Sequence, residues 1–149
     1  MTFDINNNTH REFRESDYLF QDLTYKLIGI GMEVHRHLGY GFAEVVYKDA
    51  LEEEFRRRRI NFEREKRYEV EYKGIVLPHH YFADFVIDGR VILEIKAQVG
   101  IHEEAAPQVI NYLAASRLPV GLIINFGEGA LKFKRVAFSR KHKTPIQSA

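Results

Sequence analysis

The spacing of the apolar residues changes along this chain, and no other feature restricts its fold as strongly. Between residues 17 and 38 apolar residues recur every three or four positions, which predicts one amphipathic helix that ends at the glycines after it. A second apolar arc of this period predicts a helix over residues 42–57. From residue 62 the period falls to two, which predicts a strand with one face exposed to water. The chain therefore combines helices with a sheet.

Turn residues divide the rest of the chain into further strands and one more helix. Lys73-Gly74 predicts a turn into a strand that ends at Ile87, and Asp88-Gly89 is a strong signal for the next hairpin turn. Pro107 is tolerated only in or near the first turn of the following helix. The remaining elements are expected at residues 90–97 (strand), 103–118 (helix), 120–126 (a strand buried on both faces) and 130–138 (strand).

The predicted order is α-α-β-β-β-α-β-β, which indicates one α/β domain over residues 17–138 whose mixed sheet is covered by helices. We expect residues 1–16 to be a mobile N-terminal arm, because they lack apolar periodicity, and residues 139–149 to be a basic C-terminal tail. The chain of 149 residues has no cysteine, which excludes thiol catalysis and cysteine-based metal sites. Without a signal peptide or an apolar run near the roughly 18 residues of a membrane span, we expect a soluble, cytoplasmic protein with no membrane partner.

The net charge of +1 conceals an uneven distribution. Residues 1–55 hold eleven acidic and five basic residues (−6), whereas residues 56–149 hold ten acidic and seventeen basic ones (+7). Such a division points to a face that binds a polyanion, or the two halves interdigitate and their charges mix. Likewise, the arginines of residues 56–59 either complement the dipole at a helix end or, with basic residues of 132–143, line a path for phosphates.

Charged residues inside two apolar strands indicate where the chemistry lies. Asp84 shares a strand face with Phe82 and Val86, where a lone carboxylate is costly, and Glu94 and Lys96 project together to one face of the next strand. Because the hairpin makes these strands neighbours, Asp84 and Glu94 can approach each other. Two close carboxylates repel unless a proton or cation lies between them, and oxygen ligands favour Mg²⁺ or Mn²⁺ over zinc.

An ordinary arrangement competes with this metal site. Glu94 and Lys96 then form a same-face ion pair while Asp84 bonds to the backbone. Glu44, at the edge of the second helix's apolar arc, either leans toward the sheet or is a first-turn glutamate favoured by the helix dipole. A polar row on the third predicted helix either meets a substrate backbone or serves solubility, and its members are Gln108, Asn111 and Tyr112.

Several motifs occur in an order that resembles a known family. Residues 41–47, Gly-Phe-Ala-Glu-Val-Val-Tyr, match the signature of the GxxExxY proteins. The other matching positions are Val34-His35, Leu38-Gly39, Asp84, Glu94-Ile95-Lys96, Gln108, Asn111-Tyr112-Leu113 and residues 121–127. The match covers about residues 17–138, and the family resembles a branch of the PD-(D/E)XK nuclease superfamily, whose mixed sheet carries a divalent-metal site on its second and third strands. Ala83 stands where the superfamily's name has proline.

The resemblance implies a role for each matching residue. Asp84 and Glu94 would be metal ligands, Lys96 the catalytic lysine and Glu44 an additional acidic residue supplied by a helix. Gln108 and Tyr112 would form the Q-x-x-x-Y element seen in RecB-like exonucleases. We further expect the Ile95 carbonyl in the metal shell, and the side chains assigned to substrate binding are Tyr112, Asn111, His35 and Tyr47.

We therefore expect a Mg²⁺- or Mn²⁺-dependent nuclease that hydrolyses phosphodiester bonds in nucleic acid, with DNA as the expected substrate, through a metal-activated water. A core of this size with an exposed sheet edge can also form a homodimer. The alternative is a module on the same fold that binds nucleic acid or a partner protein without catalysis, or a structural subunit of a larger complex.

Overall fold

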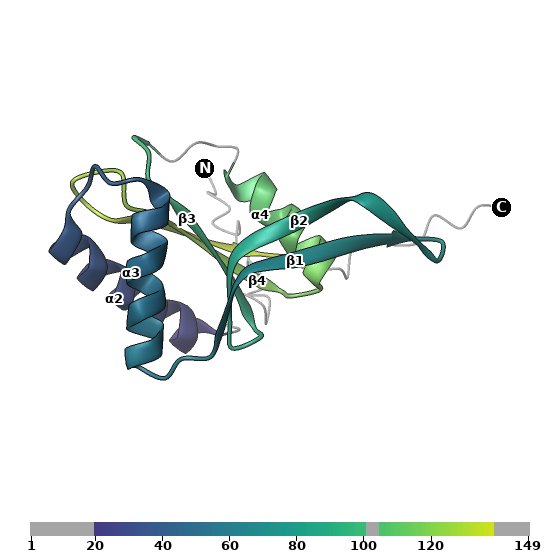
Figure 1. Cartoon of the computed structure of the whole chain (residues 1–149), viewed down its shortest axis with the longest axis horizontal. Coiled ribbons are helices and arrows are strands. Elements are labelled where there is room, and N and C mark those ends of the chain that lie inside the picture. Colours follow the sequence, from purple (N-terminus) through teal and green to yellow (C-terminus); the bar gives the residue numbers. More distant parts are fainter. Residues whose placement is uncertain (1–19, 101–104, 139–149) are drawn as a thin grey trace, which may run out of the picture.

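The structure, a computed structural model, describes residues 20–100 and 105–138. Figure 1 shows the helices gathered around a central sheet from which one long hairpin projects. The elements are α2 (Gln21–Leu38), α3 (Glu44–Arg57), β1 (Phe62–Tyr72), β2 (Ile75–Ile87), β3 (Val91–Lys96), α4 (Ala105–Ser116), β4 (Val120–Asn125) and β5 (Lys132–Ala137). Their order confirms the predicted α-α-β-β-β-α-β-β succession.

The strands form a mixed five-stranded sheet in the order β1-β2-β3-β4-β5. β3 and β4 are parallel and are joined through α4, whereas every other neighbouring pair is antiparallel. A parallel pair needs a crossover of this kind, because a short turn can join only antiparallel strands. β4 is buried along its whole length inside the sheet, as predicted from its nearly continuous apolar sequence.

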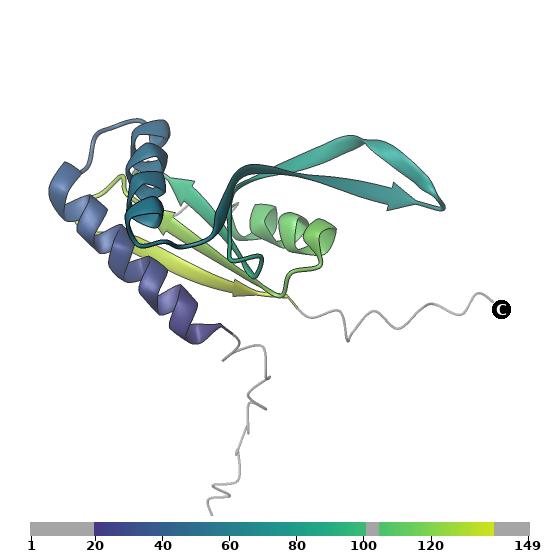
Figure 2. The ribbon, with the colours of Figure 1, turned by 60° about the horizontal axis from the view of Figure 1, so that its bottom comes forward.

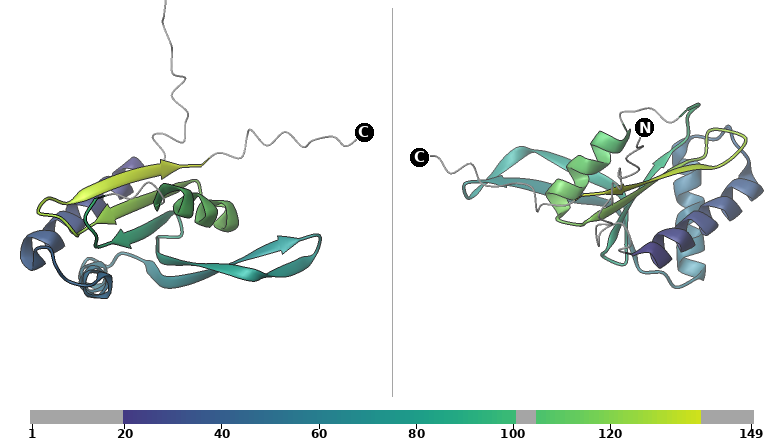
Figure 3. Two further views of the ribbon diagram at one scale, coloured as in Figure 1. Left: turned by 90° about the horizontal axis from the view of Figure 1, so that it is seen from above. Right: turned by 180° about the vertical axis from the view of Figure 1, so that it is seen from behind.

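Two apolar cores lie on the two faces of the sheet. Figures 2 and 3 show the helices over these faces, α2 and α3 on one and α4 on the other. The larger core joins α2 and α3 to the sheet and includes the fully buried Leu51, Phe55 and Phe85. The smaller core joins α4 to the other face, and its helix comes so close that a Cβ on Gly121 of β4 would collide with Val109. Burying these side chains, worth about 1.5–3 kcal/mol each, fixes both layers against the sheet.

β1 and β2 continue beyond the helices as a projecting arm (Figures 1 and 3). The arm ends at Lys73 and Gly74, whose φ angles of 49° and 78° belong to the turn type that matches the twist of a hairpin. Asp88 and Gly89 adopt the same positive φ, at 53° and 63°, between β2 and β3. Both predicted hairpin turns are therefore confirmed.

The element boundaries differ from the predicted ones by a few residues. The second helix begins at Glu44 rather than at residue 42, and β5 begins at Lys132 rather than at residue 130. The expected N-terminal arm, the beginnings of the first and third predicted helices, and the basic tail lie outside the described residues. Among the residues that the structure describes, no helix is long and apolar enough to cross a membrane.

Candidate metal and catalytic centre

Asp84 and Glu94 lie next to each other on β2 and β3, as the hairpin predicts. The paired residues of β2 and β3 that lie farthest from the hairpin turn are Phe85 and Leu93. Asp84 and Glu94 are the next residues beyond this pair, one on each strand. Oδ2 of Asp84 accepts a 2.8 Å hydrogen bond from the backbone amide of Ile95. Both residues are buried, with 7% of the surface of Asp84 and 4% of the surface of Glu94 exposed. The fold therefore holds two carboxylates together away from bulk water.

Glu94 is the least satisfied member of this pair. Its Oε2 is buried and accepts no hydrogen bond from the described residues. Burial, and then the negative charge of Asp84, raise the pKa of Glu94 to about 8, although the Lys96 ammonium opposes both effects. A proton or a cation at this oxygen would relieve the repulsion between the two carboxylates.

Lys96 connects the carboxylates to α4. Its Nζ lies 3.6 Å from Oε1 of Glu94 and donates a 3.2 Å hydrogen bond to Oε1 of Gln108. Nε2 of Gln108 in turn donates to the hydroxyl of Tyr112 at 3.1 Å. Burial and the charges of Glu94 and Asp84 raise the pKa of Tyr112 to about 12, so the phenol stays protonated. The structure thus brings two members of the predicted row on α4, Gln108 and Tyr112, to the predicted lysine.

Two residues of this site were not predicted from the sequence. Lys48 extends from α3, and its Nζ lies 2.8 Å from Oδ1 of Asp84 and 3.0 Å from Oε1 of Glu65 on β1. Burial lowers the pKa of Lys48, but the hydrogen bonds and charges of Asp84 and Glu65 outweigh it, so the pKa lies above its ordinary value. Lys48 lies one helical turn after Glu44, a spacing that could have indicated a second charged side chain facing the sheet.

The donor atoms present fit a hard divalent cation. Such a cation prefers oxygen ligands. Oε2 of Glu94 is buried beside Asp84 without a hydrogen-bond partner, so it can serve as such a ligand. Within the described ranges, however, no group of three His, Cys, Asp or Glu side chains could hold a metal ion. A metal shell would therefore rest on two carboxylates completed by backbone or water oxygens.

Glu44 and Asn111 are not joined to this centre. Glu44 is half-buried in the first turn of α3, and its carboxylate makes no hydrogen bond or ion pair with the other described residues. Its position is the one that the helix-dipole alternative predicts. Asn111 is exposed on α4.

His35 and Tyr47 have structural surroundings rather than positions at the carboxylates. Nε2 of His35 lies 2.7 Å from the carbonyl oxygen of Glu128, which links α2 to the turn after β4. Tyr47 is fully buried, stacks on Phe126 at 4.6 Å, and donates a 2.7 Å hydrogen bond to the carbonyl of Gly39. These contacts fix the loop before α3, so the signature tyrosine is placed as a packing residue with no surface for a substrate.

Asn125 holds the end of β3; its side chain is buried, and no role was predicted for it from the sequence. Its Oδ1 accepts hydrogen bonds from the backbone amides of Gln98 and Gly127, and its Nδ2 donates to the carbonyls of Gln98 and Gly100. A Cβ on Gly127 would collide with the backbone of Gln98. This packing fixes the chain that leaves Lys96 and therefore positions the lysine.

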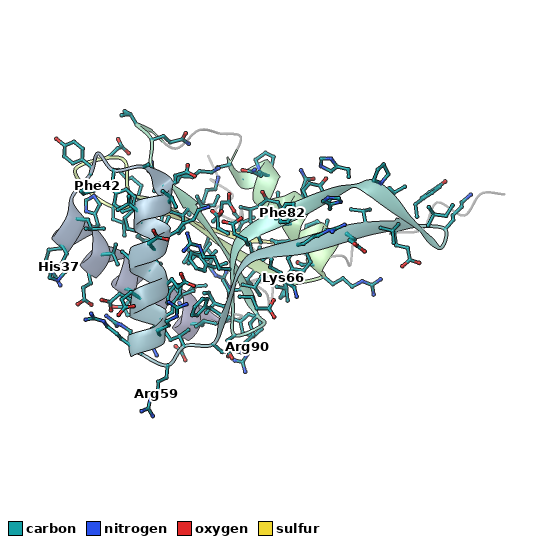
Figure 4. The ribbon with its side chains drawn as sticks, viewed as in Figure 1. His37, Phe42, Arg59, Lys66, Phe82 and Arg90 are labelled. Carbon is teal, nitrogen blue, oxygen red and sulfur yellow. The ribbon has the colours of Figure 1, made fainter. Side chains whose placement is uncertain are left out.

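The arginine cluster at the end of α3 follows the ordinary alternative. Arg56 and Arg57 each pair with the glutamate four residues earlier on α3. Arg58, directly after the helix, pairs with Glu54 of α3 and Glu33 of α2. Figure 4 shows Arg59 below the end of this helix, away from Phe82, which precedes Asp84 by two residues on β2. Arg56, Arg57 and Arg58 are consequently paired with glutamates of α2 and α3.

Comparison with known proteins identifies a family. A model described as the PD-(D/E)XK nuclease superfamily matches residues 21–136. No curated protein matches the sequence. Among solved structures, the crystal structure of SSO0001 is similar with 19% sequence identity and a TM-score of 0.47, over 62% of this chain and 48% of that chain. The similar region thus spans about half the length of that protein.

Proposed function

The chain belongs to the PD-(D/E)XK nuclease superfamily, and on that premise we propose that it is a Mg²⁺- or Mn²⁺-dependent nuclease with DNA as its substrate. One observation carries the proposal. The buried Oε2 of Glu94 has no hydrogen-bond partner in the described structure. The buried carboxylate of Asp84 lies beside it, and Oε1 of Glu94 is 3.6 Å from Nζ of Lys96. Most buried polar side-chain atoms in folded proteins have a hydrogen-bond partner, so an unpaired carboxylate oxygen supports a site that binds a cation.

Asp84, Glu94 and the Ile95 carbonyl would hold the metal. When bound, a divalent cation supplies a Lewis acid that lowers the pKa of a water and stabilises the charge on the leaving oxygen of a phosphodiester. The amide of Ile95 keeps Oδ2 of Asp84 in place through its 2.8 Å hydrogen bond. Preorganisation of this kind reduces the reorganisation needed at the moment of reaction.

Lys96 would act on the phosphate and the attacking water. Its ammonium has three N–H donors, of which one is held by Gln108 at 3.2 Å, so further donors are available for an oxygen of the substrate. Tyr112 orients Gln108 and remains a neutral phenol, because its pKa is raised to about 12. Gln108 is therefore the residue that aims Lys96. The role of Glu44 as an additional acidic residue of the site remains a prediction.

The narrower assignments belong to the same proposal. The residue 41–47 signature supports membership of the GxxExxY proteins. Substrate contacts by Asn111 remain a prediction, as do homodimerisation and a cytoplasmic location.

Incubation of the full chain with single-stranded, double-stranded, nicked and branched DNA tests the proposal. We expect cleavage that requires Mg²⁺ or Mn²⁺, that EDTA abolishes and that Asp84→Asn removes. Asp88→Asn is the matched control, because it makes the same change in a turn residue whose φ of 53° suits asparagine. Cleavage of no substrate would contradict the proposal, and metal-independent binding without cleavage would instead support the non-catalytic module.

A further inference from the structure

Lys48 forms an ion pair with Asp84, although the proposed chemistry assigns it no task. Its ammonium is 2.8 Å from Oδ1 of Asp84 and 3.0 Å from Oε1 of Glu65, and only 15% of its side chain is exposed. Its ion pair is made to the one carboxylate oxygen of Asp84 that the Ile95 amide leaves open. A metal ion that binds Asp84 through this oxygen lies close to the ammonium, and the two positive charges repel each other.

Glu65 is placed to receive the displaced lysine. The register pairs Arg64–Phe85 and Lys66–Ala83 flank it, so Glu65 lies opposite Asp84 across β1 and β2. Its φ of 53° lies in the left-handed region, which a residue other than glycine rarely adopts and which costs on the order of 1 kcal/mol. Its carboxylate is half exposed, at 52%, so an ion pair formed there needs no burial of the second charge. β1 is therefore distorted at the position where Glu65 meets Lys48.

We propose that Lys48 is a positioning residue that holds Asp84 while the site lacks metal and transfers to Glu65 when a divalent cation binds. The inference rests on the proposed metal site. Lys48 and the cation compete for one oxygen, so each weakens the binding of the other by the same free energy. Glu65 reduces this competition because it offers the ammonium a second anionic partner.

A calorimetric titration of the metal-free full chain with Mn²⁺ alone tests this competition without any substrate. Lys48→Met removes the ammonium but keeps the alkyl chain, and we expect its affinity for Mn²⁺ to rise on the order of tenfold. Lys66→Met is the control, since it removes one positive charge from the same region of β1 without a contact to Asp84. We expect Glu65→Gln to weaken Mn²⁺ binding, because Lys48 then has Asp84 as its only carboxylate partner.

The double variant Lys48→Met/Glu65→Gln separates competition from the general effect of charge. If Lys48 transfers to Glu65, the effect of Glu65→Gln largely disappears once Lys48 is absent. Equal effects of Glu65→Gln in both backgrounds, or unchanged affinity in a folded Lys48→Met protein, would overturn the inference. Should Lys48→Met fail to fold, Lys48→Arg, which keeps the charge, must retain the response to Glu65→Gln. Absence of Mn²⁺ binding in the wild type would refute the proposed metal site and this inference together, whereas binding lost only in Asp84→Asn preserves the former.

Discussion

Replacing Glu94 with glutamine should change how the stability of the metal-free protein depends on pH. The folded protein keeps the Glu94 carboxyl protonated up to a pKa of about 8, whereas the unfolded chain loses this proton near 4.5. Between these values the folded state binds one more proton, so the free energy of unfolding falls as pH rises, by roughly 1 kcal/mol per pH unit. Below pH 4.5 the stabilisation of the folded state is complete, and above pH 8 it is lost.

Urea denaturation in EDTA at pH values from 5 to 8 measures this effect. Over this range the free energy of unfolding of the wild type should fall by on the order of a few kcal/mol relative to that of Glu94→Gln, because the amide cannot ionise. Glu71→Gln is the control, because it makes the same change at an exposed position of the projecting arm. Parallel stability curves for wild type and Glu94→Gln would refute the conclusion that Glu94 is held as a buried carboxyl beside Asp84.

Three further variants test how the centre is supported. Gly127→Ala should lower the free energy of unfolding, measured in urea, by about 3 kcal/mol, because the added Cβ collides with the backbone of Gln98. Gly129→Ala should lower it little, because its Cβ meets nothing within 4 Å, and equal losses would contradict the packing. Tyr47→Phe should lower the free energy of unfolding by about 1–2 kcal/mol and leave the Mn²⁺ affinity unchanged, since its hydroxyl only ties the preceding loop; a change in Mn²⁺ affinity would place it at the centre. Gln108→Ala should lower kcat by roughly tenfold at unchanged Mn²⁺ affinity, because it orients Lys96; an unchanged kcat would remove it from the mechanism.

The sequence predicted the centre where local rules determine geometry. Asp88-Gly89 specifies a hairpin turn, and this turn makes Asp84 and Glu94 neighbours whatever the rest of the chain does. The two-residue spacing likewise places Lys96 beside Glu94, at 3.6 Å. Both contacts of the ordinary alternative are also present, namely the backbone bond to Asp84 and this ion pair, and only the unpaired oxygen of Glu94 distinguishes the two readings.

The rest of the centre depends on packing between distant segments, which periodicity does not report. Lys48 reaches Asp84 only because α3 packs on the sheet in one particular register. Glu65 is exposed, as the alternating strand predicts, but alternation reports neither its positive φ nor its ion pair with Lys48. Tyr47 illustrates the opposite error, because a motif residue was assigned to the substrate and is instead fully buried beneath the loop it holds.

The rate of DNA cleavage by Lys96→Met, at a Mg²⁺ concentration that saturates the wild type, tests the central claim most directly. The carboxylates remain in this variant, so it should still bind Mn²⁺, and Lys132→Met on the exposed edge strand β5 provides the matched control. The account predicts a loss of at least about 100-fold for Lys96→Met and none for the control, because Lys96 stabilises charge on the reacting phosphate. Cleavage by Lys96→Met at the wild-type rate would contradict it.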